Sequence, residues 1–208
     1  PGVQLLHQGL HNGGGSFEAM RIVYETIHKT PRSFLFTTKL PRQGGLDIFH
    51  NETGNCIDVA DRGVYIMRSL GIPGTMDMVL KNPGYNSRHF WNSFSCYGDL
   101  RYEFELYEVY PIACGNNAGP KRKKGIVYRQ FFAPQPDSPR NLFPDKELPR
   151  LLDDPFIVDV TDEYFPGYRL DITIDPGQQS DDVLYLCVHD GVGGSHVGVT
   201  AMENGKAS

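Results

Sequence analysis

The stretch Thr53-Gly54-Asn55-Cys56-Ile57-Asp58-Val59-Ala60 decides how the rest of this 208-residue chain is interpreted. The Gly-Asn pair resists helix formation but suits an N-cap, and the apolar residues after it recur at helical spacing as far as Leu70. Gly71 then supplies a C-terminal stop, and Pro73 prevents the helix from resuming. The pattern predicts a mostly buried helix with Cys56 in its first turn.

A cysteine in the first turn of a helix is well placed to act as a nucleophile. The N–H groups and the positive dipole end at that position favour the thiolate of Cys56 over the thiol. The alternative is that Cys56 is only a small buried hydrophobe, as isolated cysteines often are. Segments further along the chain favour the first interpretation.

Two later segments supply the partners that a thiol nucleophile needs. His89 lies in a predicted strand at residues 88–95, and Glu105 lies in a predicted strand at residues 100–109. In such a triad the histidine takes the thiol proton, and the carboxylate fixes the histidine tautomer. Asp99 is a second carboxylate between them, but it follows Gly98, which is typical of a hairpin tip. The predicted triad is therefore Cys56, His89 and Glu105.

At these residues the chain resembles the transglutaminase-like branch of the papain-like cysteine enzymes. The resemblance rests on Gly-Asn-Cys-x-Asp-x-Ala at 54–60, Arg-x-Leu-Gly-Ile-Pro at 68–73, His-Phe-Trp-Asn at 89–92 and Phe-Glu at 104–105. It is closest to bacterial transglutaminase-like proteins of the gut Bacteroides type. It covers about residues 39–132 and is looser from residue 156 onward.

The resemblance implies an α+β fold with a papain-like core, in which the cysteine begins a helix packed on an antiparallel sheet. It also implies an extracytoplasmic protein, secreted to the periplasm or cell surface. The family usually has aspartate at the third catalytic position, where this chain has Glu105. Because aspartate is the family residue, Glu105→Asp is expected to retain or improve activity.

The implied reaction is a thiol acyl transfer on a peptide or protein substrate. Cys56 attacks an amide carbonyl and forms a thioester, and His89 protonates the leaving amine. Hydrolysis is the favoured outcome, which would make the protein a cysteine peptidase or amidase; transfer to an amine would make it a transglutaminase. The competing hypothesis is a non-enzymatic binding or surface-assembly protein that keeps the fold, and Glu105 in place of aspartate favours it.

Composition excludes several other classes of function. A net charge of −5 argues against a nucleic-acid or anionic-membrane surface, and no apolar run is long enough to span a membrane. The chain has no dinucleotide or phosphate loop. No signal peptide is visible, but the sequence begins at Pro1 without a methionine, so this says nothing about a leader. His7 and His11 have the spacing of a zinc helix, but Gly9 weakens that helix. No cofactor and no metal is expected.

The pattern along the chain suggests three parts. Residues 1–133 form the predicted cysteine-nucleophile domain, beginning with a helix at 17–29. Residues 134–155 contain six prolines and are interpreted as an extended connector. Residues 156–208 form a β-rich module with strands near 156–164, 169–174, 183–189 and 197–202, and the module is expected to be incomplete.

Several residues around the predicted site are left with open roles. The backbone N–H of Cys56 is one expected oxyanion donor, and the second is either Gln43 or Asn55. Trp91 is expected to shield the pair formed by His89 and the carboxylate from water. The sequence also leaves open whether Cys96 and Cys114 form a disulfide across neighbouring strands. Asp47 and His50 are expected in a surface loop.

Overall fold

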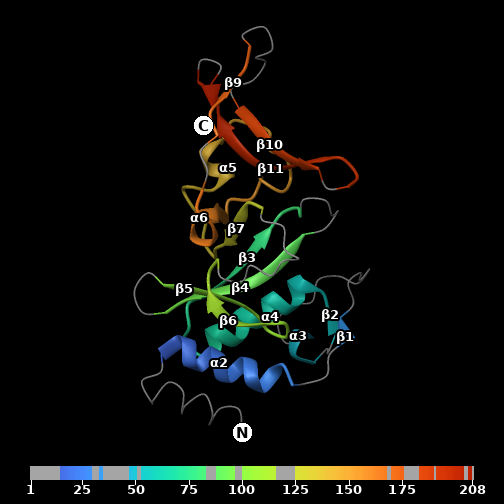
Figure 1. Ribbon diagram of the computed structural model, residues 1–208, viewed down its shortest axis with the longest axis vertical. Coiled ribbons are helices and arrows are strands. Elements are labelled where there is room, and N and C mark those ends of the chain that lie inside the picture. The colour runs from blue at the N-terminus through green and yellow to red at the C-terminus, as the bar shows by residue number, and fades with distance from the viewer. Residues whose placement is uncertain are drawn as a thin grey trace. The chain divides into compact units, whose positions relative to one another are not determined.

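The computed structural model describes residues 15–29, 33–34, 47–50, 53–82, 88–96, 100–115, 125–167, 170–175, 183–189, 191–203 and 206–207. In chain order the elements are α2 (Gly15–Ile27), β1 (Ser33–Phe34), α3 (Asp47–His50), β2 (Thr53–Gly54), α4 (Cys56–Ser69), β3 (Gly74–Val79), β4 (His89–Ser95), β5 (Arg101–Glu105), β6 (Val109–Ala113), β7 (Val127–Gln130), α5 (Pro139–Leu142), β8 (Ile157–Asp159), α6 (Thr161–Tyr164), β9 (Ile172–Thr173), β10 (Val183–His189), β11 (Gly194–Ala201) and β12 (Lys206–Ala207) (Figure 1). The chain mixes helix with antiparallel sheet, which is compatible with the predicted α+β class.

The chain forms two compact units. Unit 1 comprises residues 1–78 and 89–119, and unit 2 comprises residues 79–88 and 120–208. The largest sheet is antiparallel and has six strands in the order β6-β5-β4-β3-β7-β8. Residues 120–133, assigned from the sequence to the first domain, belong to unit 2.

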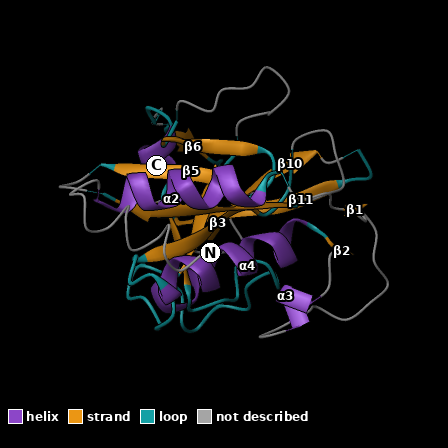
Figure 2. Ribbon diagram, turned by 90° about the horizontal axis from the view of Figure 1, so that it is seen from below, coloured by secondary structure: helices purple, strands orange, loops and turns teal. Residues whose placement is uncertain are grey.

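Helix α4 is the central helix of unit 1, and the sequence predicted both of its ends. Its buried face includes Ala60, Val64 and Met67, and it packs on β4 and β5, whereas α2 packs on β6 (Figure 2). At its C-terminus Gly71 has a φ of 73°, and Ile72 N–H donates to the carbonyl of Met67 at 2.9 Å. This is a Schellman motif, which explains why glycine is needed at the stop.

The predicted strand at residues 100–109 is in fact two strands. Strand β5 ends at Glu105, a turn follows at residues 106–108, and β6 begins at Val109. The turn is closed by the N–H of Glu108, which donates to the carbonyl of Glu105 at 3.1 Å. Glu105 therefore lies at the end of its strand, and the prediction of one strand running through it from residue 100 to residue 109 was wrong.

Both faces of β5 are buried, which the alternating pattern did not predict. Phe104 and Leu106 are fully buried, and the two glutamates on the opposite face, Glu103 and Glu105, are 4% and 7% exposed. Glu103 accepts a hydrogen bond from the N–H of Gly115 at 3.2 Å. A buried carboxylate needs such donors, because burial without hydrogen bonds costs several kcal/mol, roughly 2–7 for a polar group.

Unit 2 is more structured between residues 134 and 155 than an extended connector would be. Helix α5 begins after the buried Ser138, whose hydroxyl accepts the N–H of Asn141 at 3.2 Å. Leu148 and Leu152 are also buried. The prolines act as turn and helix-start residues here, since Pro139 occupies the first turn of α5.

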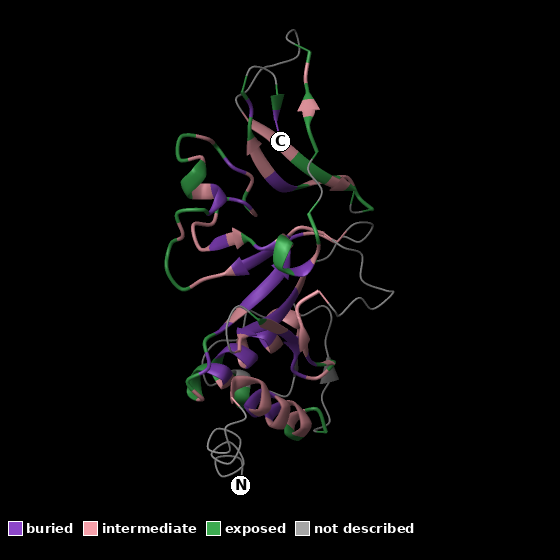
Figure 3. Cartoon of the chain, turned by 60° about the vertical axis from the view of Figure 1, so that its left-hand side comes forward, coloured by how far each residue is buried: buried purple, intermediate pink, exposed green. Residues whose placement is uncertain are grey.

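Strands β10 and β11 form a two-stranded hairpin; the predicted strand at residues 183–189 is confirmed, whereas the one expected near 197–202 begins earlier, at Gly194. The predicted strand at residues 156–164 is shorter, because helix α6 replaces its second half. Residues 183–189 were expected to be a buried strand, but every residue of β10 is partly or fully exposed (Figure 3). The apolar sequence of β10 was therefore no sign of burial, because a strand in a two-stranded hairpin can be left without a second layer packed over it.

No disulfide joins the four cysteines. Cys96 N–H donates to the carbonyl of Leu100, and Cys114 N–H donates to that of Arg101, each at 3.0 Å. The two cysteines therefore lie on opposite sides of β5, two strand spacings or about 9.6 Å apart. That separation exceeds the reach of a disulfide, about 7 Å between Cα atoms, so the open question of a Cys96–Cys114 bond is answered in the negative.

Among the described residues, none of the helices combines the length and the apolarity that a membrane span requires.

Candidate functional site

Cys56 is the first residue of α4, and a complete capping box precedes it. The Oδ1 atom of Asn55 accepts the N–H of Ile57 at 2.9 Å and that of Asp58 at 3.3 Å. The carboxylate of Asp58 accepts the N–H of Asn55 at 3.0 Å in return. These reciprocal bonds fix the start of the helix and hence the position of the half-buried Cys56.

The glycine before the cap allows this arrangement. A Cβ atom on Gly54 would lie 2.8 Å from the Cβ of Asp58, closer than side chains tolerate. Asp58 itself is only 6% exposed. It is buried because it is part of the cap. The Gly-Asn-Cys-x-Asp sequence is thus explained locally by the geometry of one helix start.

The capping box uses Asn55, one of the two residues expected as the second oxyanion donor. The backbone N–H of Asn55 is bonded to Asp58, and its Oδ1 atom faces the helix, so the structure gives Asn55 a capping role. The N–H of Cys56 lies outside the bonds that the cap makes. It stays the expected donor to an oxyanion on a substrate bound at Cys56. Gln43, the other nominated donor, lies outside the described residues.

Helix α4 packs closely on strand β4 through a buried hydrogen bond. Asn92 is 1% exposed and donates to the carbonyl of Ala60 at 2.8 Å. Gly63 lies beneath it, and a Cβ atom on Gly63 would lie only 2.0 Å from Oδ1 of Asn92. The absence of a side chain at Gly63 therefore lets the helix approach the strand. Asn92 is three residues from His89, and Ala60 is one helical turn from Cys56.

His89 and Glu105 are in direct contact. The Nε2 atom of His89 lies 3.2 Å from Oε1 of Glu105, and the two side chains are 26% and 9% exposed. An ionised carboxylate can only accept, so Nε2 carries the proton in this bond. In the neutral imidazole Nδ1 is then the basic nitrogen. A thiol proton would consequently be taken by Nδ1, with Nε2 held by the carboxylate.

The register explains why glutamate suits this position. Asn92 pairs with Phe104, so continuing the ladder places Glu105 opposite Trp91 rather than opposite His89. His89 is the diagonal neighbour on the same face, and such neighbours lie about 7–8 Å apart. A long side chain spans that distance. Shortening it by one methylene would withdraw the carboxylate by about 1.5 Å, so the structure does not favour the expectation that Glu105→Asp retains full activity.

Trp91 packs against the histidine. The rings of Trp91 and His89 are stacked, with centroids 5.7 Å apart and planes at 24°. Trp91 is 5% exposed and therefore covers part of the imidazole from water. This placement supports the shielding role expected for Trp91, because a hydrogen bond between imidazole and carboxylate is stronger where water is excluded.

The structure thus brings together two of the three predicted triad residues. His89 and Glu105 are bonded, while Cys56 begins the helix that packs on the strand of His89. No hydrogen bond between the Cys56 thiol and the His89 ring is found in the described part of the chain. Catalytic hydrogen bonds often form only when substrate binds, so the missing bond does not remove Cys56 from consideration.

Of the other residues named in the sequence analysis, some lie in the described part of the chain and some do not. Asp47 and His50 are exposed, as expected, but they form the short helix α3 rather than a loop. Asp99, His7 and His11 lie outside the described residues.

Sequence reasoning missed the contact between Gly63 and Asn92. In the sequence, Gly63 is one residue of the predicted helix, and Asn92 ends the His-Phe-Trp-Asn motif; neither pattern indicates a contact between the two. A glycine in the middle of a helix costs stability, about 1 kcal/mol relative to alanine. That cost was the available signal that another group approaches the helix there.

Comparison with known proteins adds no assignment. No protein-family model, no curated protein and no solved structure matches the chain.

Proposed function

We propose that this protein is a transglutaminase-like cysteine enzyme that cleaves a peptide or amide bond through Cys56, His89 and Glu105. The observation that carries the proposal is the hydrogen bond between His89 and Glu105 at 3.2 Å. A histidine held by a carboxylate, on the strand packed against a helix that begins with cysteine, has the parts of a thiol acyl-transfer site. In a papain-like core these parts share the same arrangement of helix and antiparallel sheet.

The proposed reaction has two steps. The Sγ atom of Cys56 attacks the carbonyl carbon of an amide while its proton moves to Nδ1 of His89. The imidazolium returns that proton to the leaving amine, and a thioester to Cys56 remains. Water, deprotonated by His89, then attacks the thioester and releases the acid and the thiol. Glu105 orients the ring and stabilises its charged form throughout.

Hydrolysis is the proposed outcome, and the chain is proposed to work in an extracytoplasmic bacterial setting on a peptide or protein. If the acceptor were a lysine amine in place of water, the same thioester would give an isopeptide bond. Product analysis distinguishes the two outcomes, since only the second joins an added amine to the substrate. The contact of Glu105 with His89 weakens the one argument for a non-enzymatic protein, namely the unusual third residue.

The proposal predicts which cysteine reacts first with an electrophile. Under limiting iodoacetamide at neutral pH and with a chelator present, Cys56 should be alkylated before Cys96, Cys114 and Cys187, because Cys56 begins helix α4 and is the nucleophile of the proposed site. Mass-spectrometric mapping of each site over time measures this.

Exposure alone predicts a different order, which makes the experiment decisive. Cys187 is exposed, whereas Cys56 is half-buried. If accessibility governed the rates, Cys187 would be labelled first. Labelling of Cys56 that is slower than that of Cys187 would leave Cys56 as a structural residue and favour the binding-protein hypothesis.

A further inference from the structure

Asn92 joins three elements of unit 1 through a single side chain. It lies in β4, and its amide nitrogen donates to the carbonyl of Ala60 in α4 at 2.8 Å and to the carbonyl of Thr75 in β3 at 3.4 Å. The side chain suits this task because a planar amide carries two N–H donors, one for each carbonyl. Asn92 is 1% exposed, so water has little access to replace these bonds.

Helix α4 touches the sheet at a second point, further along the helix. A Cβ atom on Gly74, the first residue of β3, would lie 2.2 Å from the Cε of Met67. The hydroxyl oxygens of Thr75 and Ser93 are 2.9 Å apart, and β3 and β4 are antiparallel neighbours, so Gly74 lies at the C-terminal end of β4. The last turns of α4 therefore lie over the last residues of β4.

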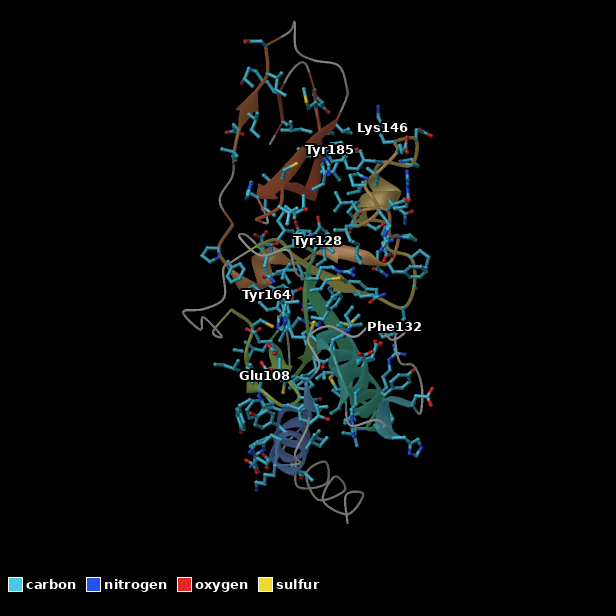
Figure 4. The ribbon with its side chains drawn as sticks, turned by 90° about the vertical axis from the view of Figure 1, so that its right-hand side faces the viewer. Glu108, Tyr128, Phe132, Lys146, Tyr164 and Tyr185 are labelled. Atoms are coloured by element: carbon cyan, nitrogen blue, oxygen red, sulfur yellow. The ribbon has the colours of Figure 1, made fainter. Side chains whose placement is uncertain are left out.

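The two contacts together give the direction of the helix on the strand. Ala60 lies over Asn92 and Met67 lies over the end of β4, so α4 and β4 run in the same direction. Figure 4 shows α4, in teal, beside the green strands of the sheet. Followed backward, the helix reaches Cys56 about 6 Å before Ala60, and the strand reaches His89 about 10 Å before Asn92. Cys56 and His89 thus lie at the same end of this helix–strand pair.

We propose that Asn92 is a positioning residue for the proposed reaction. Its bond to Ala60 is one helical turn from Cys56 and fixes where α4 lies along β4, which sets the distance between the thiol and His89. Displacement of a reacting group by about 1 Å can cost on the order of 10²-fold in rate. This inference rests on the proposed function, because it gives Asn92 a part only if His89 acts on the thiol of Cys56.

A double-mutant cycle with His89 tests the inference. The readout is the second-order rate of Cys56 alkylation by iodoacetamide at pH 7, with the exposed Cys187 of the same chain as internal reference. Asn92→Ala should slow the reaction of Cys56 more than about tenfold when His89 is present. In a His89→Ala background the same change should alter the rate by less than about twofold, because no imidazole is left for the thiol to be positioned against.

Matched variants separate positioning from stability. Asn92→Leu fills a similar volume without a donor, and it serves as the second variant and should show the same loss. Val23→Ala removes a buried side chain from α2, which packs on β6. It should lower stability and leave the rate at Cys56 unchanged. Denaturation midpoints establish that each variant is folded at the temperature of the assay.

The outcomes distinguish this inference from the function on which it rests. If Asn92→Ala and Asn92→Leu react as fast as wild type while His89→Ala is slow, the positioning role alone is overturned. An equal loss with and without His89 overturns it too, since the effect of Asn92 would then not act through the histidine. If His89→Ala reacts as fast as wild type, the proposed function is overturned and the positioning role with it.

Discussion

Replacing Glu105 with alanine is expected to lower turnover on the order of 10²-fold. Removing the orienting carboxylate of a serine triad costs about 10⁴-fold in rate, because the imidazole then adopts the wrong tautomer. The loss should be smaller here, since a cysteine thiol is intrinsically more nucleophilic than a serine hydroxyl. The measurement is kcat on the best amide substrate from a peptide library, for wild type and variant. The change should appear in kcat rather than in KM, because Glu105 contacts His89 and not the substrate.

The neighbouring Glu103 provides a matched control. It is a carboxylate on the same face of the same strand and is as buried as Glu105, and it accepts the backbone N–H of Gly115. Glu103→Gln should therefore lower stability and leave kcat nearly unchanged. Glu105→Asp should give a kcat between those of wild type and Glu105→Ala, because the shorter side chain retracts from the diagonal.

An unchanged kcat in Glu105→Ala would exclude Glu105 from the triad. Attention would then move to Asp99, whose replacement by alanine is otherwise expected to affect mainly stability.

Replacing Gly63 with alanine is expected to destabilise the protein by about 3 kcal/mol, which is the upper part of the range for overpacked cores. The new Cβ would lie 2.0 Å from Oδ1 of Asn92. Asn92 cannot move away easily, because it donates to the carbonyls of Ala60 and Thr75 at 2.8 and 3.4 Å. Alanine favours a helix over glycine by about 1 kcal/mol, and the clash should outweigh that gain. Chemical denaturation measures the free energy of unfolding.

A double variant separates the clash from other effects. Asn92→Ala removes the atom that the new Cβ would meet, so Gly63→Ala combined with Asn92→Ala should be less destabilised than the sum of the two single variants. Ser69→Ala, at an exposed position of the same helix, should change stability by less than about 0.5 kcal/mol. Strict additivity in the double variant would mean that helix and strand are held together by other contacts.

The local features of the site could be predicted because they depend on neighbouring residues. The Asn55 cap, the Gly71 stop and the bounds of α4 all follow from short-range hydrogen bonding, and the structure reproduces them. Strand β4 likewise begins at His89, within a residue of its predicted start.

Features that depend on tertiary contacts could not be predicted in this way. The turn after Glu105 contains no glycine, proline or asparagine, so no turn residue marked the break between β5 and β6. The burial of Glu105 depends on a second layer over its face, and alternation along one strand says nothing about such a layer. The exposure of β10 is the reverse case, an apolar run with little packed against it.

The central claim is that His89 activates the thiol of Cys56. The most direct test is the second-order rate of Cys56 alkylation at pH 7 in wild type and in His89→Ala, followed site by site by mass spectrometry. Since general-base catalysis contributes roughly 10²–10⁴-fold, wild type should react at least about 10²-fold faster at Cys56, with the rate at Cys96 equal in both proteins. Equal rates at Cys56 in the two proteins, with both folded, would contradict the claim.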